Sequence, residues 1–231
     1  MDTIGHGFEE AIRLIFAGDA EIFEIVGLSL YVSIFSVVVS TILGIPLGIL
    51  LGTCRFRGKG ILVRIIYTLM SLPPVIAGLA VFLILMRRGP LGSLQLNYTV
   101  AAMIIAQICL VTPIIIGLTY NMVKEKALVV NQLGMTLGAG RIQRLRLLIY
   151  EMRVGITTAV ISGFGRAISE VGAVMIVGGN IKGKTRVMTT YISELKGMGN
   201  FERAMAVGLI LLLISFVVNA ALYHFQERES R

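Results

Sequence analysis

The 231-residue chain has little charge, no tryptophan, two cysteines and two histidines. Charged residues make up 15% of it, whereas soluble domains carry about 25%. Cys54 and Cys109 lie at or within apolar stretches, so neither a disulfide framework nor a metal site is expected. His6 and His224 stand near opposite ends, without a carboxylate cluster or a nucleophile–base set. We therefore expect no catalytic residues and no cofactor, and a membrane-embedded enzyme is the weakest interpretation.

Charge is missing altogether from four long runs, which are residues 25–54, 65–86, 89–123 and 204–226. Each is long enough to cross a bilayer, which takes roughly 20 apolar residues. A fifth apolar run is interrupted by Arg166 and Glu170. The sequence thus predicts an all-α integral membrane protein with five transmembrane helices, at about 22–52, 61–86, 100–123, 154–178 and 204–225.

The distribution of Lys and Arg orients these helices. The side that contains the basic loop 124–153 holds more of them than the other side, which favours a cytoplasmic position for the loop. The N-terminus is then outside, and a short tail, 226–231, is cytoplasmic. Residues 1–21 are expected to form an amphipathic segment on the outer membrane surface. Its apolar side would consist of Phe8, Ile12, Ile15 and Phe16.

Glycine and proline predict how the helices pack and bend. Gly44, Gly48 and Gly52 repeat at four-residue spacing, which lets another helix approach closely. Three prolines interrupt the second and third runs and predict kinks there, namely Pro73, Pro74 and Pro113.

Residues 178–185 fit the phosphate-loop pattern G-x-x-x-x-G-K-[ST], but the match is rejected. The motif needs a strand before it and a helix after it, whereas here it follows a membrane helix on the outer side. The same stretch carries Asn180, Lys182, Lys184 and Arg186, which could attract an anion or dock an acidic partner. An ordinary solvated turn is the alternative, and the sequence leaves both open.

Arg166 and Glu170 lie near the middle of the fourth span, with Ser169 beside them. Charges at this depth usually pair or line a wet cavity, and the i, i+4 spacing makes mutual pairing easy. Arg166 either contributes to an anion path, held in place by Glu170, or belongs to a salt bridge that fixes helix packing. Both interpretations remain open.

Within the loop 124–153, apolar residues at helical spacing predict a short helix that ends at Gly138, followed by an amphipathic piece at 141–150. The loop resembles the cytoplasmic coupling loop of type I ABC importer permeases. On that pattern Gln132, Leu133 and Gly134 occupy the Glu-Ala-Ala positions and Gly138 the glycine, while Leu148 occupies the isoleucine position and Tyr150-Glu151 the Leu-Pro positions. The resemblance implies that the ATPase is contacted by Gln132, Leu133, Gly134, Thr136, Leu137, Gly138 and Ala139.

The stretch GRAISEVGAVMIVGGNIKGKTRVMTT resembles the molybdate and tungstate branch of this family. The stretches GFEEAIRLIFAGDAEIFEIVGLSL and SLPPVIAGL are similar to tungstate-type permeases in particular. The resemblance covers nearly the whole chain, and 22–225 is the expected ABC transmembrane type-1 domain.

The resemblance implies a permease that hydrolyses nothing itself. Its implied partners are cytoplasmic ABC ATPase subunits, an external oxyanion-binding protein, a second permease copy and membrane lipid, and no nucleic acid is expected. Sequence alone leaves open tungstate, molybdate, sulfate or another small anion. A secondary transporter is a further alternative, against which no inverted repeat is evident.

Overall fold

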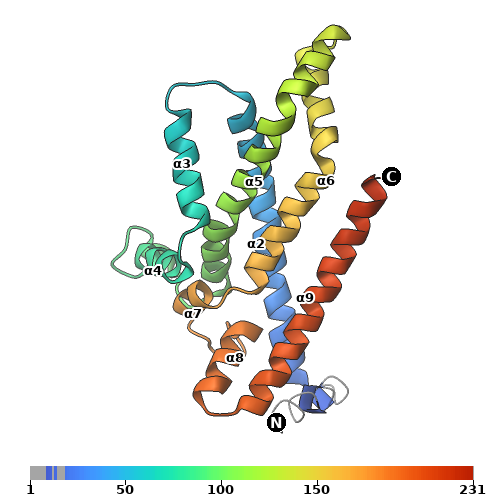
Figure 1. The fold of residues 1–231 in the computed structure, drawn as a ribbon. Helices are drawn as coiled ribbons and strands as arrows, with labels where there is room; N and C mark the ends of the chain where they lie inside the picture. Colours follow the sequence, from blue (N-terminus) through green and yellow to red (C-terminus); the bar gives the residue numbers. More distant parts are fainter. Residues whose placement is uncertain (1–8, 12, 15–18, 231) are drawn as a thin grey trace.

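The computed structural model describes residues 9–11, 13, 14 and 19–230, with side chains up to residue 224 (Figure 1). Within these residues every regular element is helical, so the all-α prediction is confirmed. The elements are α2 (Ala20–Thr53), α3 (Lys59–Met70), α4 (Pro74–Leu85), the 3-10 helix η1 (Gly92–Leu94), α5 (Val100–Thr136), α6 (Arg141–Ile168), α7 (Gly172–Gly178), α8 (Met188–Gly197) and α9 (Phe201–Ser230). The predicted amphipathic side of the N-terminal segment, Phe8, Ile12, Ile15 and Phe16, lies outside the described residues, as does His6.

Among the described residues, four helices are long and apolar enough to cross a membrane: α2, α5, α6 and α9. The pair α3 and α4 would make a fifth span, but it is bent by 102° at its break. The break falls where predicted, since Pro73 caps α4 and Pro74 begins it. Two consecutive prolines remove two backbone N–H donors, and Pro74 holds Pro73 in the extended region, so α3 does not continue through this point. By contrast, α5 runs on through Pro113.

The predicted loop 124–153 is not a loop. The helix α5 extends to Thr136 and α6 begins at Arg141, so the expected coupling helix is the end of α5 and the amphipathic piece is the start of α6. Two long helices thus form a hairpin that reaches beyond the other helices at one end of the molecule (Figure 1).

The predicted fourth span, 154–178, is also divided differently. The helix α6 stops at Ile168, and the short α7 follows after a break of three residues. The unpredicted α8 lies between α7 and α9, near the N-terminal end of the molecule (Figure 1). Moreover, α9 continues to Ser230 and takes up most of the expected tail.

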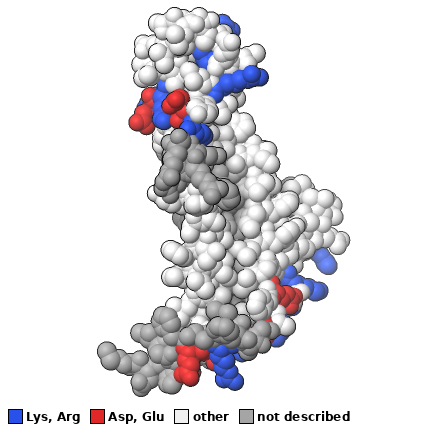
Figure 2. Space-filling model, turned by 90° about the vertical axis from the view of Figure 1, so that its right-hand side faces the viewer, with Lys and Arg blue, Asp and Glu red and all other residues white. Residues whose placement is uncertain are grey.

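The predicted close approach of the glycine stripe is confirmed. Gly44, Gly48 and Gly52 of α2 face α5, and a Cβ on Gly48 would lie 2.6 Å from the Cβ of Thr119. No real side chain tolerates that distance, so glycine here lets α2 and α5 pack backbone to backbone. Figure 2 shows the outcome at the surface: charged side chains gather toward the two ends, and an uncharged band lies between them. A band of this kind is what a bilayer covers.

Candidate functional site

The hairpin tip, residues 128–146, is built by a glycine turn. Gly138 has a φ of +69°, and the N–H of Ala139 donates to the carbonyl of Gly134 at 2.8 Å, which closes the last turn of α5. The N–H of Gly140 then donates to Oε1 of Gln143 at 2.8 Å as α6 begins. The predicted helix stop at Gly138 is confirmed, because only a residue that tolerates positive φ can reverse the chain this way.

Gly134 is required for a different reason. A Cβ at this position would lie 2.6 Å from Cγ of Arg144, so the Arg144 side chain crosses α5 where Gly134 leaves room. The two helices of the hairpin are therefore locked against each other near the tip. Two further contacts of this hairpin lie nearer its base, where Lys126 donates to the carbonyl of Glu151 at 2.9 Å and Arg153 stacks 4.0 Å over the ring of Tyr150.

The surface of the hairpin tip is apolar and open. Leu137 is 75% exposed and Leu133 is 55% exposed, because the tip lies beyond the ends of the neighbouring helices (Figure 1). Exposed apolar patches of this kind mark interaction surfaces. Of the seven predicted coupling residues, Gly134 is buried and Ala139 is half-buried, while the exposed ones are Gln132, Leu133, Thr136, Leu137 and Gly138.

The predicted pair in the middle of the molecule exists. Nη1 of Arg166 lies 2.7 Å from Oε2 of Glu170, with the Arg166 side chain 30% exposed and that of Glu170 2% exposed. The other carboxylate oxygen of Glu170 accepts the N–H of Ala173 at 3.0 Å, so Glu170 caps α7 at the same time. The Ser169 side chain is exposed and donates to the carbonyl of Gly165 at 2.8 Å. The break between α6 and α7 is thus held by one buried carboxylate.

Two residues behind this break were missed by the sequence analysis. Nε2 of Gln107 donates to the carbonyl of Ala167 at 3.0 Å, and the hydroxyl of Thr189 donates to the carbonyl of Glu170 at 2.8 Å. Both line a cavity of about 10 Å³, room for about one water molecule. Oε1 of Gln107 is buried there without a protein partner. The position of Gln107, a polar residue within the uncharged run 89–123, was the sequence signal that could have identified it.

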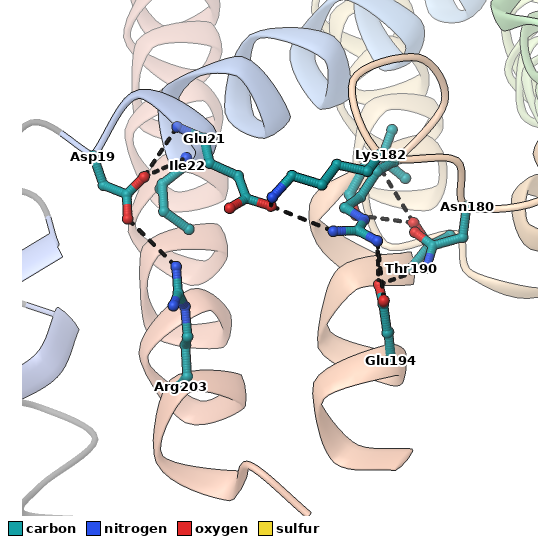
Figure 3. Close-up of polar contacts among 10 residues, drawn as sticks. Asp19, Glu21, Ile22, Asn180, Lys182, Thr190, Glu194 and Arg203 are labelled. Carbon is teal, nitrogen blue, oxygen red and sulfur yellow. Dashed lines mark hydrogen bonds and ion pairs between the residues drawn. The ribbon is translucent and has the colours of Figure 1, made fainter. Parts of the chain in front are cut away.

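At the opposite end from the hairpin tip lies the Arg186 cluster, which consists of Asp19, Glu21, Asn180, Lys182, Arg186, Glu194 and Arg203 (Figure 3). Arg186 is central: its guanidinium lies 3.3 Å from Oε1 of Glu21 and 2.9 Å from Oε2 of Glu194. Lys182 also pairs with Glu21, at 3.0 Å, and Asn180 donates to Glu194 at 2.8 Å. Three of the four predicted residues therefore meet carboxylates. The fourth, Lys184, is exposed and forms no ion pair within the described part of the chain.

The same cluster ties three helices together. Asp19 caps α2 by accepting the N–H of Glu21 at 3.0 Å, and its other oxygen lies 3.4 Å from Arg203 of α9. The Arg186 guanidinium lies 5.1 Å from the ring centre of Tyr191 on α8, and burial raises the pKa of that phenol above its ordinary value. These carboxylates could not be predicted as partners from local spacing, because Glu21 and Arg186 are 165 positions apart in the chain.

Comparison with known proteins gives consistent matches. Residues 44–231 match the family described as "Binding-protein-dependent transport system inner membrane component". The chain is 48% identical to a tungstate uptake system permease protein of Peptoclostridium acidaminophilum, over 98% of this chain and 100% of that protein. It is 38% identical to a probable anion ABC transporter permease protein of Haloferax volcanii, over 89% and 90% of the two chains. It is 35% identical to a tungstate uptake system permease protein of Campylobacter jejuni, over 95% and 92%.

Among solved structures, the chain resembles one from the inward-facing MetNI methionine ABC transporter, with a TM-score of 0.71 and 17% sequence identity. The match covers 92% of this chain and 98% of the other. At this level of identity the likeness concerns the fold, and it confirms the fold predicted in the sequence analysis.

Proposed function

Since this chain belongs to the family of binding-protein-dependent transport system inner membrane components, we propose that it is the permease subunit of an ATP-driven importer for an oxyanion, with tungstate as its cargo. The observation that carries this proposal is the 48% identity with a tungstate permease over 98% of the chain. Molybdate and sulfate are the alternative cargoes, because they too are tetrahedral dianions.

In this proposal two copies of the chain enclose the passage, and a cytoplasmic ATPase subunit binds each hairpin tip. ATP is hydrolysed on that separate subunit. An external oxyanion-binding protein delivers the anion at the other end. The N-terminus is then outside, and the C-terminal end of α9 is cytoplasmic. The open apolar surface around Leu133 and Leu137 supports the placement of the ATPase.

The hairpin supplies a lever. The helix α6 is continuous over 28 residues, about 42 Å of helix, so a displacement at Arg141 reaches Arg166 through an unbroken hydrogen-bonded rod. Beyond it, Glu170 holds both Arg166 and the first turn of α7. A push on the tip would therefore shift the pair and reorient α7 about the break at 169–171.

Arg166 is the side chain we assign to the anion path. A guanidinium has five N–H donors, and at least one of those of Arg166 is used by Glu170. Its partial exposure, together with that of Ser169, leaves donors for a passing oxyanion. The Glu170 carboxylate offsets the positive charge, so that the anion binds weakly enough to leave.

The Arg186 cluster then serves to fix the outer ends of α2, α8 and α9 as a platform for the binding protein. Its cations are matched by carboxylates, so it contributes shape more than net attraction. Lys184 and Asn180 remain in our proposal as contacts at the rim of this platform.

The test is uptake of labelled tungstate by cells that express the chain with its ATPase and binding protein, combined with capture of the ATPase by the purified permease. Leu137→Asp is expected to abolish both, because it places a charge at the centre of the apolar contact. Met198→Asp is the matched control for ATPase capture, since Met198 is 70% exposed at the other end of the molecule, away from the hairpin tip.

Unchanged ATPase capture by Leu137→Asp would contradict the assignment of the hairpin tip. Uptake that survives ATP depletion but collapses with the ion gradient would instead identify a secondary transporter. For the cargo, excess unlabelled tungstate should suppress uptake more than equal molybdate or sulfate. Equal suppression by molybdate would widen the cargo to both anions.

A further inference from the structure

A groove lies between the C-terminal end of α2 and the hairpin. Its volume is about 450 Å³, within the range of roughly 300–1,000 Å³ that is typical of ligand pockets. The helix α5 contributes Val130 and Asn131 to its lining, and α6 contributes Arg141, Arg144, Leu145 and Leu148. The lining is therefore amphipathic, since it combines two arginines with three aliphatic side chains.

The positive charge in this groove is not neutralised by the described part of the chain. No Asp or Glu lines the groove, and neither Arg141 nor Arg144 forms an ion pair with a described residue. Nε of Arg144 is buried and has no hydrogen-bond partner. Because this Nε is buried, an anion in the groove would bind the terminal nitrogens of the guanidinium, and the contact with Gly134 holds the side chain in place. The groove thus lacks an anionic acceptor.

The position of the groove indicates which anion is at hand. Thr53 is the last residue of the apolar helix α2, and the polar turn with Arg55 and Arg57 follows it. Thr53 and Cys54 line the groove, so it opens at the boundary between the bilayer and water. The anions concentrated at this boundary are the phosphates of acidic phospholipids, and basic pockets beside membrane helices bind such headgroups.

We propose that this groove binds the headgroup of an anionic phospholipid. The phosphate would accept from Arg141 and Arg144, while the glycerol and the first methylenes lie along Val130, Leu145 and Leu148. A bound lipid would brace the hairpin against the C-terminal end of α2, beside the hairpin tip. The inference is independent of the cargo, because it requires only that the chain spans a membrane.

The experiment uses the full chain in nanodiscs of phosphatidylcholine, with or without phosphatidylglycerol, and counts retained lipids by native mass spectrometry. The wild-type chain is expected to retain phosphatidylglycerol selectively. Arg141→Gln and Arg144→Gln should each lower that retention about fivefold, since one basic residue at the surface contributes about that factor. Arg146→Gln is the matched control, because Arg146 lies on the same helix but does not line the groove.

Thermal unfolding in phosphatidylcholine alone separates binding from folding. Arg141 is exposed and packs on no glycine, so Arg141→Gln should unfold as the wild type does there and yet lose the stabilisation that phosphatidylglycerol provides. Equal retention of the two lipids, or an equal loss with Arg146→Gln, would overturn the proposal.

Two further results would assign the groove to another occupant. If inorganic phosphate, without phosphatidylglycerol, stabilises the protein in the same arginine-dependent way, the groove is a free oxyanion site. If the double variant Arg141→Gln with Arg144→Gln loses ATPase capture while lipid retention is unchanged, the groove belongs to the ATPase interface. Either result overturns the assignment to lipid.

Discussion

The hairpin tip and the Arg186 cluster lie at opposite ends of the molecule, and both are basic in the sequence. At the tip, Arg141 and Arg146 form no ion pair with a described residue, and exposed leucines surround them. In the Arg186 cluster, carboxylates from α2 and α8 meet the guanidinium of Arg186 and leave its side chain only 12% exposed. One region leaves its charge and apolar surface open to partners, whereas the other uses its charge to join helices.

The difference shows that basic residues in a loop of a membrane protein do not by themselves indicate a docking surface. Charge density in the sequence was similar enough to suggest docking at both ends. What separates them is whether acidic residues from distant parts of the chain arrive at the same place. Substitutions that remove charge should therefore affect stability at one end and partner binding at the other.

The largest effect is expected for the ion pair between Arg166 and Glu170, which lies between the two ends of the molecule. Arg166→Met leaves the buried Glu170 carboxylate without its cation, which should destabilise the protein by about 3–5 kcal/mol and abolish uptake. Thermal unfolding of the purified chain and tungstate uptake measure the two effects.

The double variant Arg166→Met with Glu170→Gln sharpens this prediction, because Gln can still accept the N–H of Ala173. We expect it to regain stability but not uptake. If uptake returns as well, the pair is structural and Arg166 has no role in the anion path.

Arg186→Met should have the next largest effect. It leaves Glu194 without a cation and Glu21 with Lys182 alone, so the free energy of unfolding should fall by about 2 kcal/mol, less than for a fully buried pair. Lys184→Met and Arg146→Met, which remove charges that form no ion pair with described residues, should leave unfolding unchanged. Equal destabilisation by all three variants would erase the distinction between the two regions.

Gly138→Ala tests the hairpin tip, and its expected effect is smaller than that of Arg186→Met. The left-handed conformation costs an alanine about 1–2 kcal/mol, and the strain falls on the turn that presents Leu137. We expect weaker ATPase capture, measured by the affinity for the purified subunit. Gly140→Ala is the control, because Gly140 has a φ of −67° and a Cβ there would meet only Oε1 of Gln143, at 3.7 Å. An equal loss with Gly140→Ala would show that general loosening of the hairpin, not the positive φ, is responsible.

Among the variants expected to change stability, Lys182→Met should have the smallest effect. Its side chain is 68% exposed, so the ion pair with Glu21 should contribute about 0.5 kcal/mol, and salt should screen it. Chemical unfolding at low and high ionic strength measures this. A loss as large as that of Arg186→Met would mean that the cluster acts as one unit, in which exposure does not set the contribution of each pair.

Much of the fold followed from local patterns. Uncharged runs predicted the spans, the doubled proline predicted the break before α4, and the glycine stripe on α2 predicted its contact with α5. Each of these rests on the physics of a single helix or of one helix face. Helix limits were less predictable, because the polar residues of 124–153 and the small residues near Ser169 fit a loop or a helix equally well.

The candidate sites divide in the same way. The pairing of Arg166 with Glu170 was readable from a spacing of four, and the turn at Gly138 from the conformational freedom of glycine. The partners of Arg186 were not readable, because α2, α8 and α9 meet only in the folded chain.

By itself, the sequence determined that the chain has several segments able to cross a membrane and that its doubled proline breaks a helix before α4, since both depend on apolar length and backbone freedom within one segment. Only the tertiary structure decided which charges are neutralised and which stay open. Ion pairing depends on distances of a few ångströms between residues far apart in the chain, and packing alone sets those distances.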